Sequence, residues 1–316
     1  MLCPSCGVEY PAVQGGKCPR CGADAPADAP DRPGLPWQQL HKYGFILGFV
    51  ENLTLVLFSP RVAFRRMRLQ PGYLNSLCFL AIAFCLAGLP PLLGTLKDFG
   101  KYGAINGYVF NFPGKAAYVA LVTVSHILNA PFEALCYSFL IYSLTAFSGR
   151  KTRYSVCFAT YAHTFGASLM WRSPGEFFFI VNRGRIFSLS TRVYWIWVDY
   201  ADVVLLSGYA VRIYTVFLLY FAFGHLFGMS RRDSLIAGIL YAIPAIGTFW
   251  LEAQIWQLCN LELEPNTLWD KFAFDYGLRL ILNLWAATVA FSILATKYFL
   301  QNRSSRYSRL KEHEDA

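Results

Sequence analysis

Four cysteines in the first 22 residues have the types and spacing of a metal site. Cys3 and Cys6 form one CxxC pair, and Cys18 and Cys21 form a second. Each pair lies in a C-P-x-C-G sequence, in which the glycine permits the tight turn that brings two thiolates onto one ion. Four thiolates at this spacing are typical of a tetrahedral structural zinc site. Because the segment is too short to have an apolar core, we expect one zinc ion to supply its folding free energy.

Two disulfides or a redox CxxC pair are the alternatives to a zinc site. Disulfides need an oxidising compartment, and no secretory signal precedes the cysteines in this sequence. A redox pair needs a larger fold around it than this segment offers. Only Lys17 and Arg20 are basic here, so the segment lacks the basic stripe of a nucleic-acid-binding ribbon. We therefore expect a zinc ribbon at 1–22 that contacts a protein partner, not a nucleic acid.

Three charged residues interrupt long apolar stretches: Glu133, Arg212 and Glu252. Ionisable residues inside membrane spans are candidates for a substrate or proton site. Arg212 and Glu252 fall at a similar depth, which predicts that they pair. The polar residues expected to gather around Glu133 are Asn129, His126 and His163. The alternative, which we favour, is structural: the same residues would join helices by hydrogen bonds worth about 0.6 kcal/mol each.

The composition of the whole chain explains why membrane spans are expected. Of 316 residues, 55% are hydrophobic and 15% are charged, whereas soluble domains carry about 25% charged residues. Six stretches are long enough to cross a bilayer, with approximate limits 74–96, 118–147, 154–171, 205–228, 235–257 and 278–299. The sequence therefore predicts an all-α multipass membrane bundle with about six transmembrane helices, or five if the short third stretch does not span.

The distribution of basic residues predicts the orientation of these spans. The formal net charge is +9, and with six spans the basic clusters all fall on one side: before the first span, at 150–153, at 231–232 and after residue 296. The connection at 258–277, on the other side, is acidic. Because cytoplasmic loops are enriched in Lys and Arg, we expect both termini to be cytoplasmic and the chain to lie in a bacterial inner membrane.

Residues 37–73, which precede the first span, are expected to form interfacial helices. The stretch 44–58 is apolar but carries Glu51 and Asn52, and a basic segment follows it. This pattern indicates an amphipathic helix on the inner leaflet, where each arginine near anionic lipid is worth about 1 kcal/mol. An ordinary basic flank of the first span is the alternative. The residues assigned to this lipid surface are Arg61, Phe64, Arg65, Arg66 and Arg68.

Three short motifs resemble the Yip1-domain family of multipass membrane proteins. The segment LFSPRVAFRRM contains the P-x-x-A-F element that precedes the spans in that family, here Pro60, Ala63 and Phe64. FSGRKTRYSV, followed by the Tyr-Ala pair at 161–162, resembles the hairpin between its second and third helices. FGHLFGMSRRDSLIAGILYAIPA resembles its fourth-to-fifth hairpin. The resemblance covers roughly residues 45–257 and implies five spans, a membrane-organising role and, in bacterial members, an N-terminal zinc ribbon.

The expected organisation follows from these signals. It comprises a zinc ribbon (1–22), a Pro/Ala/Asp-rich linker (23–36), interfacial helices (37–73), a Yip1-like transmembrane domain (74–300) and a charged cytoplasmic tail (301–316). Within the transmembrane domain, the insertion 172–204 contains two short apolar runs that favour a hairpin or interfacial pieces on the outer face.

The expected function is non-enzymatic. The motifs HExxH, GxSxG, Walker loop and GxGxxG do not occur. We expect the chain to organise membrane lipid or partner proteins through its ribbon, with homo-oligomerisation left open. The alternative is a transporter or channel with its polar site around Glu133, Arg212 and Glu252.

Overall fold

A computed structural model describes residues 32–69, 71–98, 104–105, 108–109, 112–150, 152–171, 200–262 and 268–314. Three parts of the expected organisation lie outside these described residues: the zinc ribbon at 1–22, the linker up to residue 31 and most of the insertion, at 172–199. The expectations for these parts stay predictions.

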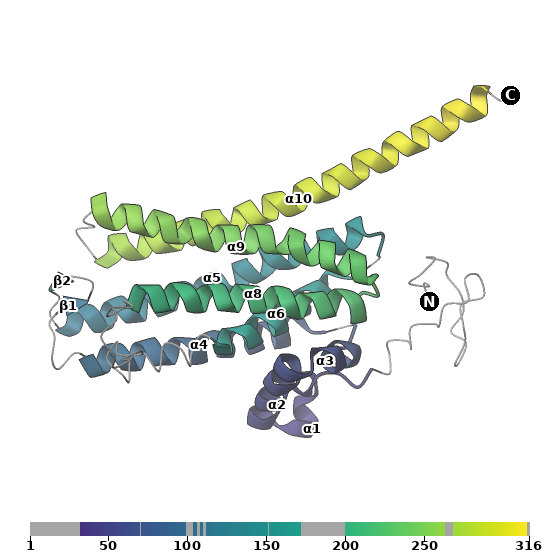
Figure 1. Ribbon diagram of the computed structural model, residues 1–316. Coiled ribbons are helices and arrows are strands. Elements are labelled where there is room, and N and C mark those ends of the chain that lie inside the picture. The colour runs from purple at the N-terminus through teal and green to yellow at the C-terminus, as the bar shows by residue number, and fades with distance from the viewer. Residues whose placement is uncertain are drawn as a thin grey trace, which may run out of the picture.

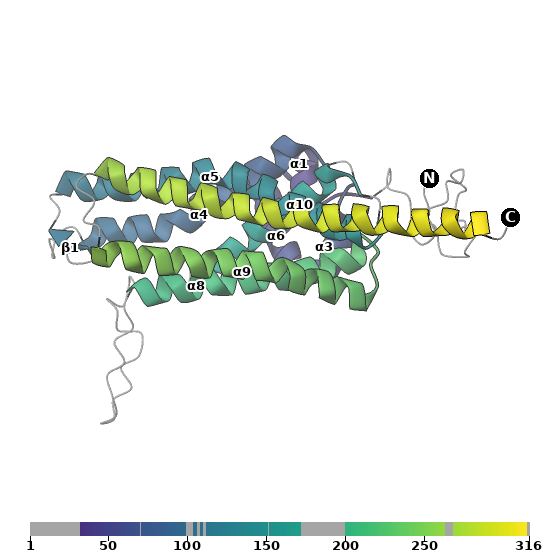
Figure 2. The same cartoon turned by 90° about the horizontal axis from the view of Figure 1, so that it is seen from above.

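Long helices running along a common axis make up most of the described chain (Figures 1 and 2). They are α4 (Tyr73–Asp98), α5 (Phe112–Phe147), α6 (Tyr154–Ser168), α8 (Tyr200–His225), α9 (Arg231–Glu262) and α10 (Leu268–Glu314). A helix therefore lies at each of the six stretches that the sequence predicts. A 3₁₀ turn, η3 (Leu169–Trp171), continues α6. Between α4 and α5, two-residue strands β1 (Ala104–Ile105) and β2 (Tyr108–Val109) pair antiparallel.

Four segments of the described helices are long and apolar enough to cross a membrane: Leu128–Phe147, Leu206–His225, Arg231–Leu251 and Tyr276–Gln301. Two further apolar helical segments, Phe45–Phe58 and Tyr73–Ala87, are shorter, and α6 has 15 residues. Many large apolar side chains on the bundle's outer surface are exposed, as they would be in contact with lipid. The described residues therefore form a helical bundle with four candidate membrane spans, as in an integral membrane protein, and the count of six spans stays a prediction.

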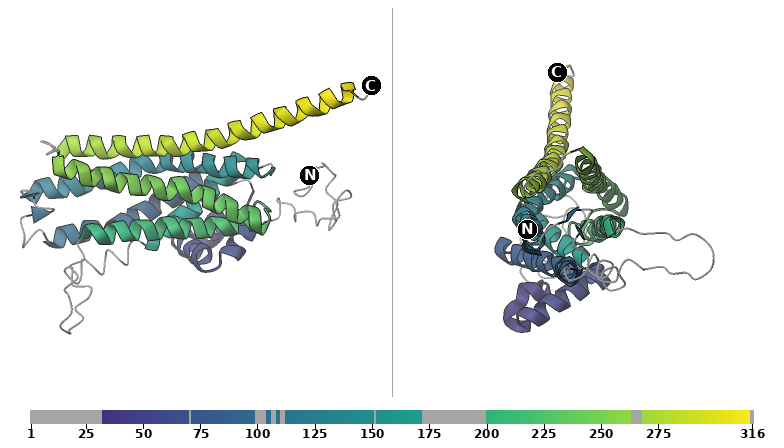
Figure 3. Two further views of the ribbon diagram at one scale, coloured as in Figure 1. Left: turned by 45° about the horizontal axis from the view of Figure 1, so that its top comes forward. Right: turned by 90° about the vertical axis from the view of Figure 1, so that its left-hand side faces the viewer.

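Glycines and a serine close the turns at one end of the bundle. Gly149 ends α5 with a φ of +78°, and Gly228 follows α8 with a φ of +65°, a backbone conformation that glycine adopts without a steric penalty. The side chain of Ser230 then accepts a hydrogen bond from the backbone N–H of Asp233 at 3.1 Å, which caps the start of α9. The two turns lie at the same end of the bundle, from which α10 also projects (Figures 1 and 3).

A small N-terminal unit packs against the side of this same end. It comprises η2 (Pro36–Gln39), α1 (Leu40–Tyr43), α2 (Phe45–Phe58) and α3 (Pro60–Arg66). The indole of Trp37 is buried and donates a hydrogen bond to the carbonyl of Asn75 in α4 at 2.6 Å. Its ring also contacts Phe49 and Phe79 at centroid distances of 5.9 and 5.7 Å. Aromatic packing therefore fixes the N-terminal unit to the bundle.

The last predicted span and the charged tail belong to one helix. The apolar segment Tyr276–Gln301 agrees closely with the span predicted at 278–299, and α10 continues from it through the charged tail to Glu314. Its last turns extend beyond the other helices (Figure 3). Residues after 300 contain few apolar positions but no Pro or Gly, so helix propensity can extend the segment once the span has formed.

Candidate functional site

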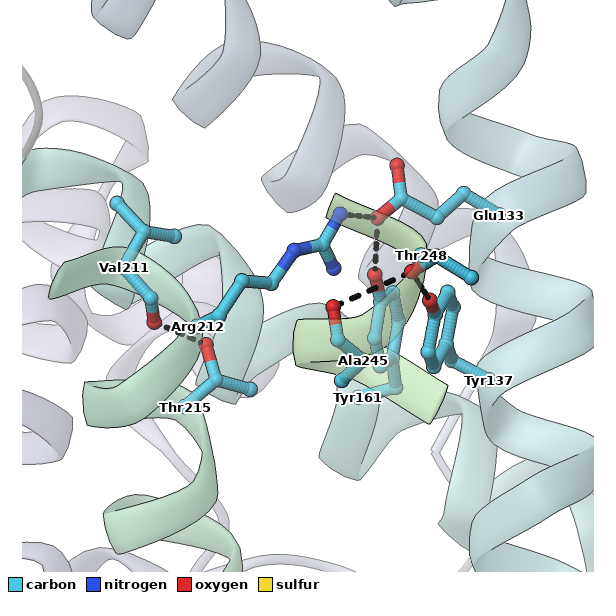
Figure 4. Close-up of polar contacts among 8 residues, drawn as sticks. All are labelled: Glu133, Tyr137, Tyr161, Val211, Arg212, Thr215, Ala245 and Thr248. Carbon is cyan, nitrogen blue, oxygen red and sulfur yellow. Dashed lines mark hydrogen bonds and ion pairs between the residues drawn. The ribbon is translucent and has the colours of Figure 1, made fainter. Parts of the chain in front are cut away.

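The centre of the bundle contains a buried ion pair between α5 and α8. A guanidinium nitrogen of Arg212, Nη2, lies 2.8 Å from Oε1 of Glu133, and the two side chains are only 14% and 11% exposed. The same carboxylate oxygen accepts a hydrogen bond from the hydroxyl of Tyr161, on α6, at 2.9 Å. Figure 4 shows the three side chains converging from their separate helices. Buried charges need such partners because burial removes their hydration.

A second polar contact joins the same cluster to α9. The hydroxyl of Tyr137, one helical turn after Glu133, lies 2.8 Å from the hydroxyl oxygen of Thr248. The Thr248 hydroxyl also lies 3.2 Å from the carbonyl of Ala245, to which it can donate (Figure 4). The rings of Tyr137 and Tyr161 stack at 5.6 Å. Four helices thus contribute to one polar and aromatic network in the bundle interior.

Two aromatic rings also contact the Arg212 guanidinium. Its central carbon lies 4.6 Å from the ring centroid of Phe165 and 5.4 Å from that of Tyr137. Cation–π contacts of this kind strengthen when water is excluded. The other terminal nitrogen, Nη1, is buried without a hydrogen-bond partner. The N–H groups of Nη1 are therefore donors that this cluster does not use.

A small cavity of about 20 Å³ opens beside this network. Its wall is formed by polar residues of α5, α8, α9 and α10 together with one leucine: Asn129, Glu133, Tyr137, Arg212, Thr248, Arg279, Leu282 and Asn283. A space of this size holds about one water molecule. Its lining offers amide, hydroxyl, carboxylate and guanidinium groups, which can bind a small polar species or a proton carrier.

No family model, curated protein or solved structure matches this chain. The function is therefore argued from the site itself, and the likeness to Yip1-domain proteins rests on the sequence motifs alone.

The structure brings some of the expected intramembrane residues together and separates another. Arg212 contacts Glu133, which the sequence placed in the same polar site; its predicted pair with Glu252 stays a prediction, because the Glu252 side chain lies outside the described part of the chain. Asn129 lies on the cavity wall with Glu133, as expected. His163 does not join them, because its Nδ1 lies 3.2 Å from the amide nitrogen of Asn52 in α2. The side chain of His126 also lies outside the described residues.

Several residues of the network were missing from the sequence prediction. Tyr137, Tyr161 and Thr248 are ordinary residues in apolar stretches, and nothing in their types marks them. Arg279 and Asn283 carry a clearer signal, since they lie one turn apart in the last predicted span. Polar residues inside a span are expected to face the bundle interior, and both of these line the cavity.

The predicted lipid surface on α3 needs one correction. Arg61, Arg65, Arg66 and Arg68 are exposed, as a lipid-facing surface requires. Phe64, however, is fully buried, together with Ala63 and Met67. The apolar side of α3 therefore covers the protein, because a helix that packs against a bundle shows the same amphipathic pattern as one that lies on lipid. The exposed residues of α3 that can meet a membrane are its arginines and Val62.

The metal site that the sequence predicts cannot be placed on the described residues. Cys3, Cys6, Cys18 and Cys21 all lie outside them. Among the residues that the structure does describe, no group of three or more His, Cys, Asp or Glu could hold a metal ion. The chemistry of a four-cysteine zinc ribbon at 1–22 stays a prediction from spacing.

Proposed function

We propose that this chain is a non-enzymatic multipass membrane protein of Yip1-like type that organises lipid and protein partners at one end of its helical bundle. The observation that carries the proposal is the placement of α3. Buried Phe64 and Met67 fix it to the bundle, while Arg61, Arg65 and Arg66 remain exposed beside the turns of other helices. A basic surface held in this way is suited to an anionic leaflet.

The zinc ribbon is the proposed protein-binding part of this assembly. It precedes the basic end in the sequence and is joined to it by a Pro/Ala/Asp-rich linker, a composition that gives an extended, semi-rigid tether. Four zinc-bound thiolates would give the ribbon a defined surface without an apolar core. In this proposal the bundle anchors the chain, and the tethered ribbon captures a partner at the cytoplasmic face of a bacterial inner membrane.

Chemical crosslinking in native membranes tests the ribbon's part in the proposal. The full chain is compared with a Cys3→Ser plus Cys6→Ser variant, and a Cys78→Ser plus Cys85→Ser variant serves as the matched control. Crosslinked partner proteins should disappear in the ribbon variant only, with membrane insertion unchanged in both. Partner adducts that persist in the ribbon variant would contradict the proposal.

A transporter or channel is the second candidate function, and the buried network around Arg212 favours it. Ion pairs in the bundle interior mark ion or proton pathways in many membrane proteins. Here the pair adjoins a polar cavity, and one guanidinium nitrogen is available. The same geometry also suits a purely structural joint between α5 and α8, which is the interpretation that accompanies the lead proposal.

Proton flux into liposomes separates these two interpretations. The full chain is reconstituted with an internal pH-sensitive dye and a membrane potential is imposed. Flux that the full chain supports and that Glu133→Gln and Arg212→Ala both abolish, with Arg232→Ala as the exposed-arginine control, would support transport. Flux that survives both substitutions, or no flux with the full chain, would rule out proton conduction through the site.

A further inference from the structure

The end of α2 and the beginning of α3 lie alongside the C-terminal half of α8. The hydroxyl of Tyr214 donates to the carbonyl of Leu57, the last residue but one of α2. Further along, the guanidinium carbon of Arg61 lies 5.5 Å from the ring of Phe221. Moving along the chain from the end of α2 into α3 therefore corresponds to moving along α8 toward its C-terminal end.

Two arginines of α3 and a histidine of α8 meet at that end. The Phe221 ring lies parallel to the His225 imidazole, with a centroid distance of 6.3 Å and an interplanar angle of 5°. Arg61 reaches the same place through its contact with the Phe221 ring, and Arg65 lies one helical turn after Arg61 on α3. Both arginines are exposed, and neither has a carboxylate partner within the described ranges. Two unneutralised guanidiniums and an imidazole therefore share one small area, which we call the α3–α8 basic site (Arg61, Arg65, His225).

An exposed apolar strip leads away from this basic site along α8. Ile213 and Phe217 are 58% and 48% exposed, and they lie four residues apart on the face that continues to Phe221. Phe58, which directly follows Leu57 in the sequence, is 71% exposed. From Phe217 to His225 the helix rises about 12 Å, a distance comparable to that from a lipid phosphate to the upper part of its acyl chains.

We propose that the α3–α8 basic site binds the phosphate headgroup of an anionic phospholipid, with the acyl chains lying on Ile213 and Phe217. Guanidinium groups form paired hydrogen bonds to phosphate oxygens, so Arg61 and Arg65 supply both charge and geometry, and His225 adds a ring N–H. The apolar strip below them selects a lipid over a free phosphate. This inference deepens the lead proposal by naming the class of lipid that is bound. It rests on that proposal in one respect, that this end of the bundle lies at a membrane leaflet.

Photocrosslinking of the full-length purified chain tests the site. The probe is phosphatidylglycerol with a photoreactive acyl chain, compared with phosphatidylcholine carrying the same chain. Crosslinks from phosphatidylglycerol should concentrate in the α8 segment 213–221. In the Arg61→Gln plus Arg65→Gln variant, apparent affinity for the probe should fall at least about 30-fold, because each arginine loses its direct charge-assisted hydrogen bonds to the lipid phosphate.

A matched variant with the same change in charge separates a specific site from general surface attraction. Arg231→Gln plus Arg232→Gln removes two exposed arginines from the neighbouring start of α9, and it should lower the affinity less than about threefold. Inorganic phosphate should not displace the probe. Equal losses in the two variants, displacement by phosphate, or equal labelling by phosphatidylcholine would each overturn the proposal. Protein crosslinking with the ribbon variant tests the proposed function, and lipid photocrosslinking with the arginine variants tests the lipid site. Because the two readouts are independent, failure of one proposal is distinguishable from failure of the other.

Discussion

Breaking the Glu133–Arg212 ion pair from one side should destabilise the chain far more than removing both charges together. The perturbation is a double-mutant cycle with Glu133→Leu, Arg212→Met and the two combined. Each single substitution leaves one buried charge without its partner, since the two side chains are only 11% and 14% exposed. The combined variant leaves neither charge, and its apolar side chains fill similar space.

The structure sets the expected magnitudes of this cycle. Removing one partner of a buried ion pair costs about 3–5 kcal/mol, whereas replacing both with apolar residues is often nearly neutral. The combined variant still leaves the Tyr161 hydroxyl without its acceptor, which costs about 1–3 kcal/mol. The double variant should therefore be more stable than the sum of the single effects predicts, by more than about 2 kcal/mol.

The assay is the free energy of unfolding in mixed micelles, measured by SDS titration. A second cycle, Tyr137→Phe with Thr248→Val, provides an internal control, because it removes a neutral hydrogen bond of the same 2.8 Å length. Its coupling should be about 0.6 kcal/mol, the average for interhelical hydrogen bonds in membranes. Effects of the Glu133 and Arg212 substitutions that add to within about 0.5 kcal/mol would refute the ion pair and the network built on it.

Three further predictions follow from other parts of the molecule. Metal analysis of the full chain should find one zinc ion per chain, and Cys18→Ser should lose it; zinc that stays bound in this variant would exclude the four-cysteine ribbon. By SDS titration, Phe64→Ala should cost about 3–5 kcal/mol because this side chain is fully buried, whereas Val62→Ala, 47% exposed, should change stability by less than about 0.5 kcal/mol; equal effects would place Phe64 on the lipid surface. Gly208→Ala should cost about 1–3 kcal/mol, because its added methyl carbon would overlap the Phe249 ring, and Phe249→Leu in the same chain should recover part of the loss; a neutral Gly208→Ala would contradict this close approach of α8 and α9.

The sequence was sufficient to predict the helices because apolar length carries that information directly. A helix lies at each of the six predicted stretches. The limits of the last span were also close, since the apolar segment of α10 covers Tyr276–Gln301, but the sequence did not show that the helix itself continues to Glu314. Apolar content ends at the bilayer surface, but hydrogen bonding within a helix does not depend on lipid.

The partners within the site were harder to predict from sequence. Depth along a span can be counted, and this count placed Arg212 level with Glu252. Which side of each helix faces which neighbour depends on how the bundle packs, so the contact between Arg212 and Glu133 could not be found in this way. For the same reason, His163 points to Asn52 in α2 and not to Glu133. The amphipathic pattern of α3 likewise could not distinguish a face that covers protein from one that covers lipid.

The proposed function depends on the basic end of the bundle facing the cytoplasm, and cysteine labelling of intact bacterial cells tests this most directly. Arg153→Cys and Arg232→Cys place reactive thiols at the turns of that end, and Asn266→Cys places one between α9 and α10; the unsubstituted chain measures the background from its own cysteines. A membrane-impermeant maleimide should label Asn266→Cys in intact cells, and it should label Arg153→Cys and Arg232→Cys only after the membrane is opened. Labelling of the two turn variants in intact cells, with Asn266→Cys protected, would contradict the orientation and with it the proposed role of α3 and the ribbon.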